Sequence, residues 1–374
     1  MGSFGRTASE GSGTKTMNVK FTRWIILGVL LVTLAVPAFS QTSAPVHLLV
    51  VGQIELKRPE WLKFQLAGPV KKLGLDDLVR AQQPGAKILC ANQRKRPIPN
   101  KNTPVREICL QGEPQMIKSG RSRVGLPRGG TDPLIPYIIS PRRTLLLDDK
   151  PLIRWNAVPN ATHYTVRLRG PSGVIWQTEV RQTEVRYPGT LALQPLVGYA
   201  LIVQTDTGVS STEEGLPGLG FELMAPNEAK RIKAEVEQLT QEELTDEARV
   251  LALANLYNGE GLTLAAIEVL QQAIANGTRK TAVYSLLGEL YREVRLNLYA
   301  KDSYLKAIDL AKIGGDLEAQ AEAQSALGEI YVVLKDRTAA VKTFSKARLA
   351  YVALEGNESA HARKILEQIA TLNP

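Results

Sequence analysis

The apolar positions of this chain follow four patterns in succession. A continuous apolar run covers residues 24–36, and short β-branched segments follow over residues 46–90. Over residues 141–224 apolar and polar positions alternate, which is typical of half-buried strands. From Asn227 onward the apolar positions recur with a period near 3.6, which predicts helices. A chain of 374 residues is too long to fold around one hydrophobic core, so we expect a multidomain protein. The patterns predict a β-rich N-terminal domain, a β-sandwich and an all-α C-terminal region.

The helical region contains a sequence unit that recurs three times. In residues 281–311, positions 4, 7, 8, 11, 20, 24 and 27 are Tyr284, Leu287, Gly288, Tyr291, Ala300, Tyr304 and Ala307. Thirty-four residues earlier the same positions are Val250, Leu253, Ala254, Tyr257, Ala266, Leu270 and Ala273. Forty residues later, after six extra residues around 313–316, they are Gln324, Leu327, Gly328, Tyr331, Ala340, Phe344 and Ala347. This pattern closely resembles the tetratricopeptide repeat family, without its final proline.

The resemblance implies a tetratricopeptide solenoid over residues 226–374, with helical hairpins near residues 247–280, 281–314 and 321–354. Small residues at positions 8, 20 and 27 let paired helices approach closely, and larger ones fill the seams between units. Further helices, expected over residues 227–239 and 358–372, would shield the two ends. We expect the first helix of each unit to end at Asn258-Gly259, Asn297 and Asp336.

By the same resemblance, the repeats would bind a protein or peptide partner in a concave groove formed by positions 2, 5, 9, 12 and 13. Those residues are Ala248, Leu251, Asn255, Asn258, Gly259, Ala282, Ser285, Glu289, Arg292, Glu293, Glu322, Ser325, Glu329, Val332 and Val333. A basic clamp for acidic C-termini is disfavoured, because Arg292 is the only cation among them. The groove is mildly acidic and suits a basic or amphipathic peptide. The alternative is that the array packs on its own N-terminal domains.

The alternating region, residues 141–225, contains the sequence features of a two-sheet domain. Trp155 and Tyr164 fall on the apolar faces of two strands, and we expect both in the core, with His163 towards solvent. A Leu-x-Pro-x-x-x-Tyr stretch ends at Tyr199 and resembles a tyrosine corner. The region is therefore similar to a fibronectin type III or immunoglobulin-like sandwich.

The N-terminal residues 1–40 have the order of a secretory signal peptide. Lys20 and Arg23 precede the apolar run, and a small-x-small pattern follows Pro37. Met17 offers a more usual start than Met1 does. Thirteen apolar residues span about 20 Å as a helix, against about 30 Å of hydrocarbon. We expect an exported, periplasmic or extracellular protein, with an uncleaved membrane anchor as the alternative.

Residues 41–120 weakly resemble the FecR-type domain of bacterial envelope proteins. The stretch that begins at Gly52 and ends at Lys57-Arg58 fits its opening motif, and Asp76-Asp77 stands where that family has Gly-Asp. We expect a flexible linker over residues 121–140. Residues 71–150 carry 16 basic and 7 acidic side chains, whereas the whole chain has a net charge of +9. The excess positive charge is thus concentrated before the repeats.

Both cysteines, Cys90 and Cys109, border a basic loop. We expect them to form a disulfide, because an exported protein meets an oxidising compartment. The cations of the loop are Arg94, Lys95, Arg96, Lys101 and Arg106. They would contact an anionic envelope polymer or lipid headgroups. Nucleic acid is disfavoured, because Tyr137 is the only aromatic residue from Cys90 to Ser140.

The sequence contains none of the common catalytic or metal-binding motifs. His47, His163 and His361 lie in three separate segments, and no Gly-x-Ser-x-Gly, P-loop or His-Glu-x-x-His motif occurs. We therefore expect no enzymatic activity and no cofactor or metal. The favoured function is an exported scaffold that binds a partner through the repeats. The alternative is an envelope-associated module that binds an anionic polymer or membrane surface through the basic N-terminal domain.

Overall fold

The computed structural model describes residues 47–68, 71–90, 95–109, 129–216 and 219–372. The predicted signal peptide, Arg94 and residues 121–128 of the predicted linker lie outside this part of the chain. Residues 41–374 form one compact unit. Within the described ranges, no helix is long and apolar enough to span a lipid bilayer.

Over its described residues, the N-terminal domain consists of two four-stranded sheets and one short helix. One sheet has the order β4-β1-β6-β7 and the other β3-β2-β5-β8. Their strands are β1 (His47–Val51), β2 (Ile54–Lys57), β3 (Gln65–Ala67), β4 (Lys72–Leu73), β5 (Leu78–Ala81), β6 (Lys87–Leu89), β7 (Lys95–Pro97) and β8 (Thr103–Pro104), followed by α1 (Val105–Cys109). The core is apolar and fully buried at Ile54, Leu56, Val79 and Ile88. The expected β-rich domain is confirmed, whereas its likeness to FecR stays a prediction.

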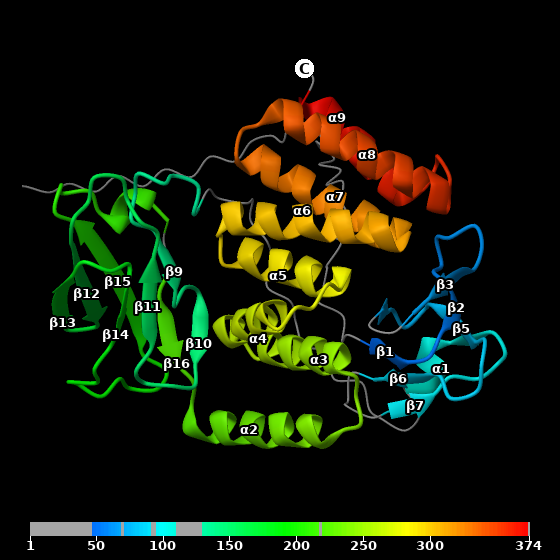
Figure 1. Ribbon diagram of the computed structural model, residues 1–374, viewed down its shortest axis with the longest axis horizontal. Helices are drawn as coiled ribbons and strands as arrows, with labels where there is room; N and C mark the ends of the chain where they lie inside the picture. The colour runs from blue at the N-terminus through cyan, green and yellow to red at the C-terminus, as the bar shows by residue number, and fades with distance from the viewer. Residues whose placement is uncertain (1–46, 69–70, 91–94, 110–128, 217–218, 373–374) are drawn as a thin grey trace, which may run out of the picture. The chain divides into compact units, whose positions relative to one another are not determined.

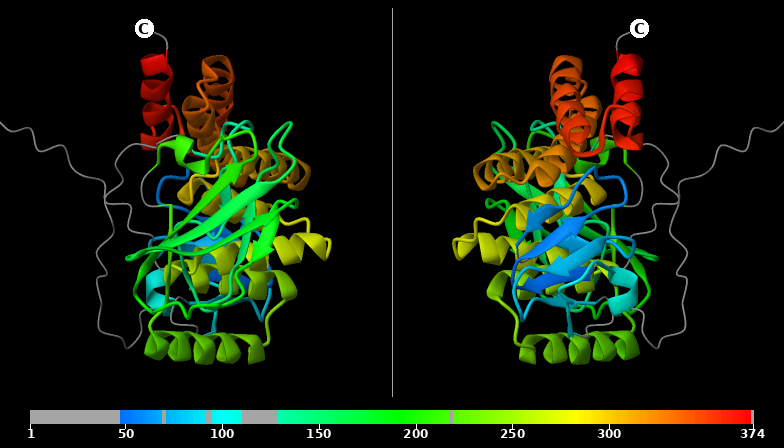
Figure 2. Two further views of the ribbon diagram at one scale, coloured as in Figure 1. Left: turned by 90° about the vertical axis from the view of Figure 1, so that its left-hand side faces the viewer. Right: turned by 90° about the vertical axis from the view of Figure 1, so that its right-hand side faces the viewer.

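The middle domain pairs a five-stranded sheet, β10-β16-β15-β12-β13, with a three-stranded sheet, β14-β11-β9 (Figure 2, left). The strands are β9 (Ile138–Ser140), β10 (Thr144–Leu146), β11 (Leu152–Trp155), β12 (Tyr164–Gly170), β13 (Gly173–Val180), β14 (Glu184–Arg186), β15 (Gly198–Thr205) and β16 (Phe221–Leu223). Because β9 begins at Ile138, the end of the predicted linker belongs to this folded domain.

Aromatic side chains fill the core of the middle domain. Trp155 and Tyr164 are buried as expected, with ring centroids 5.4 Å apart and their planes at 66°. The Tyr199 hydroxyl accepts a hydrogen bond from the Gln194 backbone N–H at 2.7 Å. This bond back to the preceding backbone is the contact that defines a tyrosine corner. His163 lies on the surface, as strand alternation predicts.

The C-terminal region is a row of helical hairpins that fits a tetratricopeptide solenoid (Figure 1). The described helices are α2 (Pro226–Gln241), α3 (Asp246–Gly259), α4 (Thr263–Ala275), α5 (Thr281–Glu293), α6 (Asn297–Gly314), α7 (Leu317–Val333), α8 (Arg337–Glu355) and α9 (Ala360–Leu372). The pairs α3–α4, α5–α6 and α7–α8 coincide with the three predicted units. The helices α2 and α9 flank them, as expected.

The position-8 glycines show why the units need small residues. A Cβ atom on Gly288 would lie 2.7 Å from the Tyr304 ring, and one on Gly328 would lie 2.5 Å from the Phe344 ring. Real Cβ atoms do not approach other heavy atoms so closely. The partner aromatics come from position 24 of the same units, so each hairpin packs a ring directly on a bare helix backbone.

The turns between paired helices correct one expectation. The first helices of units two and three end at Glu293 and Val333, and the left-handed residues Arg295 and Lys335 follow them. Asn297 is therefore the first residue of α6. Asp336 caps α8, because its side chain accepts a hydrogen bond from the Ala339 backbone N–H at 2.9 Å. These two polar residues start second helices rather than end first ones.

A buried arginine joins the middle domain to the repeats. The Arg142 side chain is fully buried, and its guanidinium donates to both Glu214 carboxylate oxygens at 2.8 and 2.9 Å. Its other N–H groups donate to the backbone carbonyls of Ile138, Val294 and Arg295 at 2.6–3.2 Å. Val294 and Arg295 form the α5–α6 turn. All five guanidinium donors are thus satisfied, as burial of a charge requires.

Candidate functional site on the inner face of the repeats

The N-terminal domain covers part of the repeat face that the sequence assigns to a groove. Strand β1 lies beside α3 (Figure 1), and Leu89 of β6 is buried in one apolar cluster with Leu251 of α3. At the other end, the core of the N-terminal domain continues into Ala347 and Leu354 of α8. The backbone N–H of Leu62 donates to the Leu354 carbonyl at 3.1 Å. The chain's own β-domain therefore occupies groove surface in unit one and packs on the second helix of unit three.

A buried charge network fixes this contact. Arg58 donates to Asp77 in its own domain at 2.6 Å and to Glu318 of α7. Lys71 lies 2.7 Å from Glu318 and 2.9 Å from Asp316. The Glu318 side chain is only 5% exposed. Burial opposes the charged form of Lys71, but the carboxylates of Glu318 and Asp316 outweigh it and raise the pKa of Lys71.

The six extra residues of the third unit create this docking point. Helix α6 runs five residues longer than α4, and α7 begins four residues before the unit register at Ala321. Asp316 and Glu318 lie in these added turns. Arg58 and Lys71 of the N-terminal domain thus form their ion pairs with the repeats at this insertion.

An acidic cavity of about 300 Å³ opens beside the network. Both domains line it, through Arg58, Glu60, Lys72, Leu73, Gly74, Glu318, Glu322, Tyr351, Glu355 and His361.

Two groups in this cavity have raised pKa values. The pKa of Glu322 is raised to about 7, first because its carboxyl group loses water and next because of the negative charge of Glu318. His361 lies 2.8 Å from Glu355 through Nδ1, and its ring stacks on Tyr351 at 4.6 Å. The hydrogen bond to Glu355 raises the pKa of His361.

The predicted groove residues have three different fates. Leu251 is buried, and Asn255 donates within its own helix to the Leu251 carbonyl at 2.7 Å. Arg292 and Glu329 form an ion pair of 2.6 Å that links units two and three. Ala248 and Val333 are buried as well. The remaining predicted residues keep some exposure, and these are Asn258, Gly259, Ala282, Ser285, Glu289, Glu293, Glu322, Ser325 and Val332.

Glu289 is the groove residue that meets the N-terminal domain through a surface ion pair. Its carboxylate lies 3.4 Å from Lys72, and both side chains are more than a third exposed. Screened pairs of this kind contribute little to stability. Together with the exposed Glu293 and the cavity residue Glu322, Glu289 gives the open part of the inner face an excess of negative charge.

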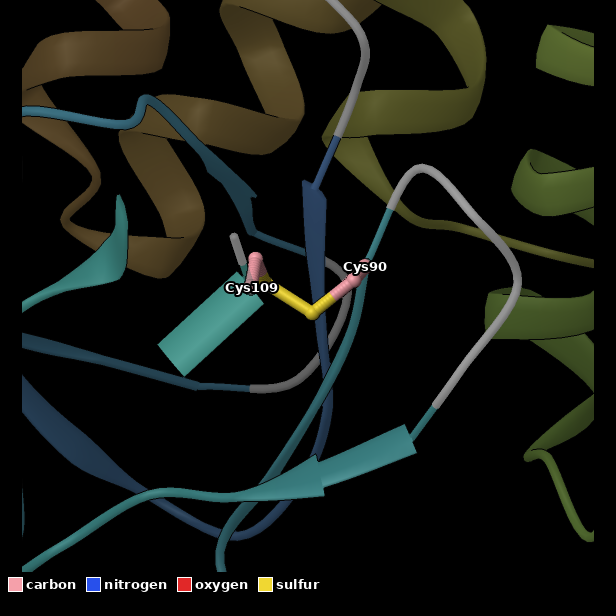
Figure 3. The surroundings of a disulfide bond; sticks show 2 residues. All are labelled: Cys90 and Cys109. Carbon is pink, nitrogen blue, oxygen red and sulfur yellow. A yellow bond between two sulfur atoms is a disulfide. The ribbon is translucent and has the colours of Figure 1, made fainter. Parts of the chain in front are cut away.

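The cysteines form the predicted disulfide (Figure 3). Cys90 follows β6 and Cys109 ends α1, with their Cα atoms 5.5 Å apart. Among the basic loop residues, Lys101 is exposed, Arg96 is half-buried, and Arg106 pairs with Asp76. Arg94 and the Lys95 side chain are not described. Binding of this loop to an anionic polymer or to lipid stays a prediction.

Sequence reasoning missed Arg58, Lys71 and Lys72 as the functional cations of the N-terminal domain. All three point to carboxylates of the repeats, on Glu318, Asp316 and Glu289. The available signal was the excess of positive charge before the repeats. It does not identify pairs of residues that are more than 200 positions apart.

Comparisons with known proteins give a limited result. No protein-family model matches the chain, and no curated protein matches it significantly. A crystal structure of BtubC (BKLC) from P. vanneervenii matches with 22% identity and a TM-score of 0.33, over 39% of this chain. The chain covers 63% of that BtubC chain, which is less than two thirds of its length.

Two crystal structures of MamA match at similar levels. One has 21% identity and a TM-score of 0.27, over 40% of this chain and 95% of that chain. The other has 19% identity and a TM-score of 0.26, over 39% and 76% respectively. Matches of this strength carry no information about function, so the assignment of the helical repeats depends on the packing of this chain itself.

Proposed function

We propose that this protein is a non-enzymatic scaffold that binds a basic segment of a partner protein on the acidic inner face of its helical repeats. The observation that carries the proposal is the set of acidic residues on that face, the exposed Glu289 and Glu293 together with Glu322 in the acidic cavity. The N-terminal domain covers the neighbouring surface and forms one wall of the acidic cavity. A partner would thus contact the repeats and this domain together.

The other modules have roles that follow from their contacts. We infer that the middle domain is an immunoglobulin or fibronectin type III-like sandwich, supported by its five-plus-three strand order and the tyrosine corner. Its Arg142 side chain donates a hydrogen bond to the Val294 carbonyl and so stabilises the α5–α6 turn. The disulfide supports export to an oxidising compartment.

Peptide binding tests the proposal directly. A fluorescein-labelled 15-residue peptide, with lysines and arginines on one helical face and leucines on the other, is titrated with the full chain. At pH 8, where Glu322 is ionised, we expect the affinity to fall about tenfold or more in Glu293→Lys combined with Glu322→Lys, because two attractions become repulsions. Glu367→Lys on the exposed side of α9 is the matched control. Equal affinity in the double variant and the control would refute the proposal.

A further inference from the structure

The third repeat departs from the other two at one buried position. Position 4 is Val250 in unit one and Tyr284 in unit two, and both pack against the apolar core. In unit three the same position is Gln324, which is only 2% exposed. The Gln324 side-chain oxygen is buried without a hydrogen-bond partner among the described residues. A buried amide oxygen without a partner destabilises a fold, so packing alone does not account for it.

Gln324 lines a second cavity of about 390 Å³. The cavity lies between the end of α6 and the hairpin α7–α8, and its other lining residues are Lys312, Leu317, Gln320, Lys346, Leu349, Ala350 and Ala353. The six-residue insertion also forms part of this cavity, because Lys312 and Leu317 lie on either side of the α6–α7 turn. The buried Gln324 and the six-residue insertion, which both depart from the repeat pattern, thus contribute to the same cavity.

The cavity faces away from the N-terminal domain. Along α7, Glu318 and Glu322 turn to that domain and the acidic cavity, whereas Gln320 and Gln324 line this second cavity. It is therefore a separate surface from the acidic inner face.

The lining has the chemistry of a peptide site. Leu317, Leu349 and the two alanines form an apolar floor, and Leu349 is 66% exposed. Ile313, which follows Lys312 in the chain, is 84% exposed. Lys312 and Lys346 are the charged residues of the lining, with no carboxylate among the lining residues.

The two lysines have little to neutralise them. Lys312 has a single carboxylate at 3.9 Å, that of Asp309, and both side chains are half exposed or more. No ion pair is formed by Lys346 with any described residue. The wall is thus positive, opposite in sign to the inner face.

We propose that this cavity binds a short acidic peptide segment of a partner, in which a large aliphatic residue is flanked by Asp or Glu. The aliphatic side chain would cover Leu317 and Leu349, and the flanking carboxylates would pair with Lys312 and Lys346. The Gln324 amide would bond the peptide backbone, either accepting from an N–H or donating to a carbonyl. This site is additional to the acidic inner face and would let one chain hold two oppositely charged segments.

A peptide fits this surface better than a membrane does. The unpaired amide lies at depth in a concave site, and a peptide strand can present a backbone N–H there. A flat bilayer surface would meet the exposed lysines and leave Gln324 unpaired.

The experiment uses the full chain and a fluorescein-labelled 12-residue peptide with two leucines among aspartates and glutamates. We expect saturable binding, an affinity about tenfold lower in Lys346→Glu, and unchanged affinity in the α9 control Lys364→Glu. A peptide with lysine in place of every acid, and one with serine in place of leucine, should bind at least tenfold more weakly.

Gln324→Leu separates binding from folding. Leucine restores the apolar type found in the other units, so we expect a higher urea midpoint together with severalfold weaker peptide binding. Wild-type affinity in both Lys346→Glu and Gln324→Leu would overturn the proposal, as would equal binding of the lysine peptide. Binding of anionic phospholipid vesicles that depends on Lys346, without peptide binding, would overturn it in favour of a membrane.

Discussion

Glu322 and His361 face the same cavity, and both bind protons more tightly than their free side chains do, for different reasons. Glu322 loses solvation and lies near Glu318, while the cations Lys71, Arg58 and Lys72 act in the opposite direction. His361 gains a hydrogen bond to the buried carboxylate of Glu355. The surroundings of Glu322 stabilise its neutral form, and those of His361 stabilise its charged form. Both residues therefore link the stability of this region to pH.

The sign of this linkage is the same for both residues. Between pH 4.5 and about 7 the folded state holds a proton on Glu322 that the unfolded state has lost, so stability falls as pH rises. His361 contributes stability below pH 6.5, which is lost as pH rises through its raised pKa. We predict that the urea midpoint of the wild type falls from pH 5 to pH 8 and that Glu322→Gln removes much of this fall. Glu367→Gln should leave the profile unchanged, and parallel profiles for wild type and Glu322→Gln would contradict the prediction.

At the scale of elements, the repeat hairpins depend on close approach between a helix backbone and an aromatic ring. Phe344 is 1% exposed and Tyr304 is equally enclosed, so neither ring has room to move away. The bare backbone at Gly288 and Gly328 is thus a packing requirement. It explains why small residues at position 8 mark the units so clearly in the sequence.

We predict that Gly328→Ala destabilises the protein by about 1–3 kcal/mol, because the new methyl group would overpack the contact with Phe344. The control is Gly314→Ala at the end of α6, where an added Cβ meets no atom within 4 Å. That change should be neutral or stabilise by up to about 1 kcal/mol, because alanine favours helix more than glycine does. Urea unfolding followed by circular dichroism measures both, and equal midpoints would count against the packing argument.

At the scale of the whole molecule, the N-terminal domain and the third repeat depend on each other. Their shared apolar cluster includes Ile54 and Phe344, and the buried network of Arg58, Lys71 and Glu318 crosses the same boundary. Buried pairs are screened weakly by salt, so this contact should persist at high ionic strength. The apolar cluster and the charge network therefore fix the N-terminal domain in the position where it lines the acidic cavity.

We predict that Glu318→Gln costs about 3 kcal/mol, because it removes a carboxylate that two buried cations share. Hydrogen exchange measured by mass spectrometry should become faster in β2, β5 and the start of α7. Glu289→Gln is the matched control, since its pair with Lys72 is exposed and contributes only about 0–1 kcal/mol. Unchanged exchange in Glu318→Gln would show that the apolar contact alone holds the domain.

The sequence by itself determined the features that arise from neighbouring residues. Local periodicity predicted the helices, and the spacing of small and aromatic positions gave the resemblance to the tetratricopeptide family that implied the three hairpins. The tyrosine corner at Tyr199 was predicted from a stretch of seven residues. The disulfide was predicted from only two cysteines, which allow a single intramolecular pairing.

Only the tertiary structure decided which predicted groove residues are open and which are covered. The Arg58–Glu318 pair joins residues 260 positions apart, and no local pattern contains such a pairing. Gln324 looked like one more member of the repeat series, and only packing shows that its amide oxygen is buried without a partner among the described residues. Periodicity tells which face of an element is apolar, whereas the partner of that face depends on the path of the whole chain.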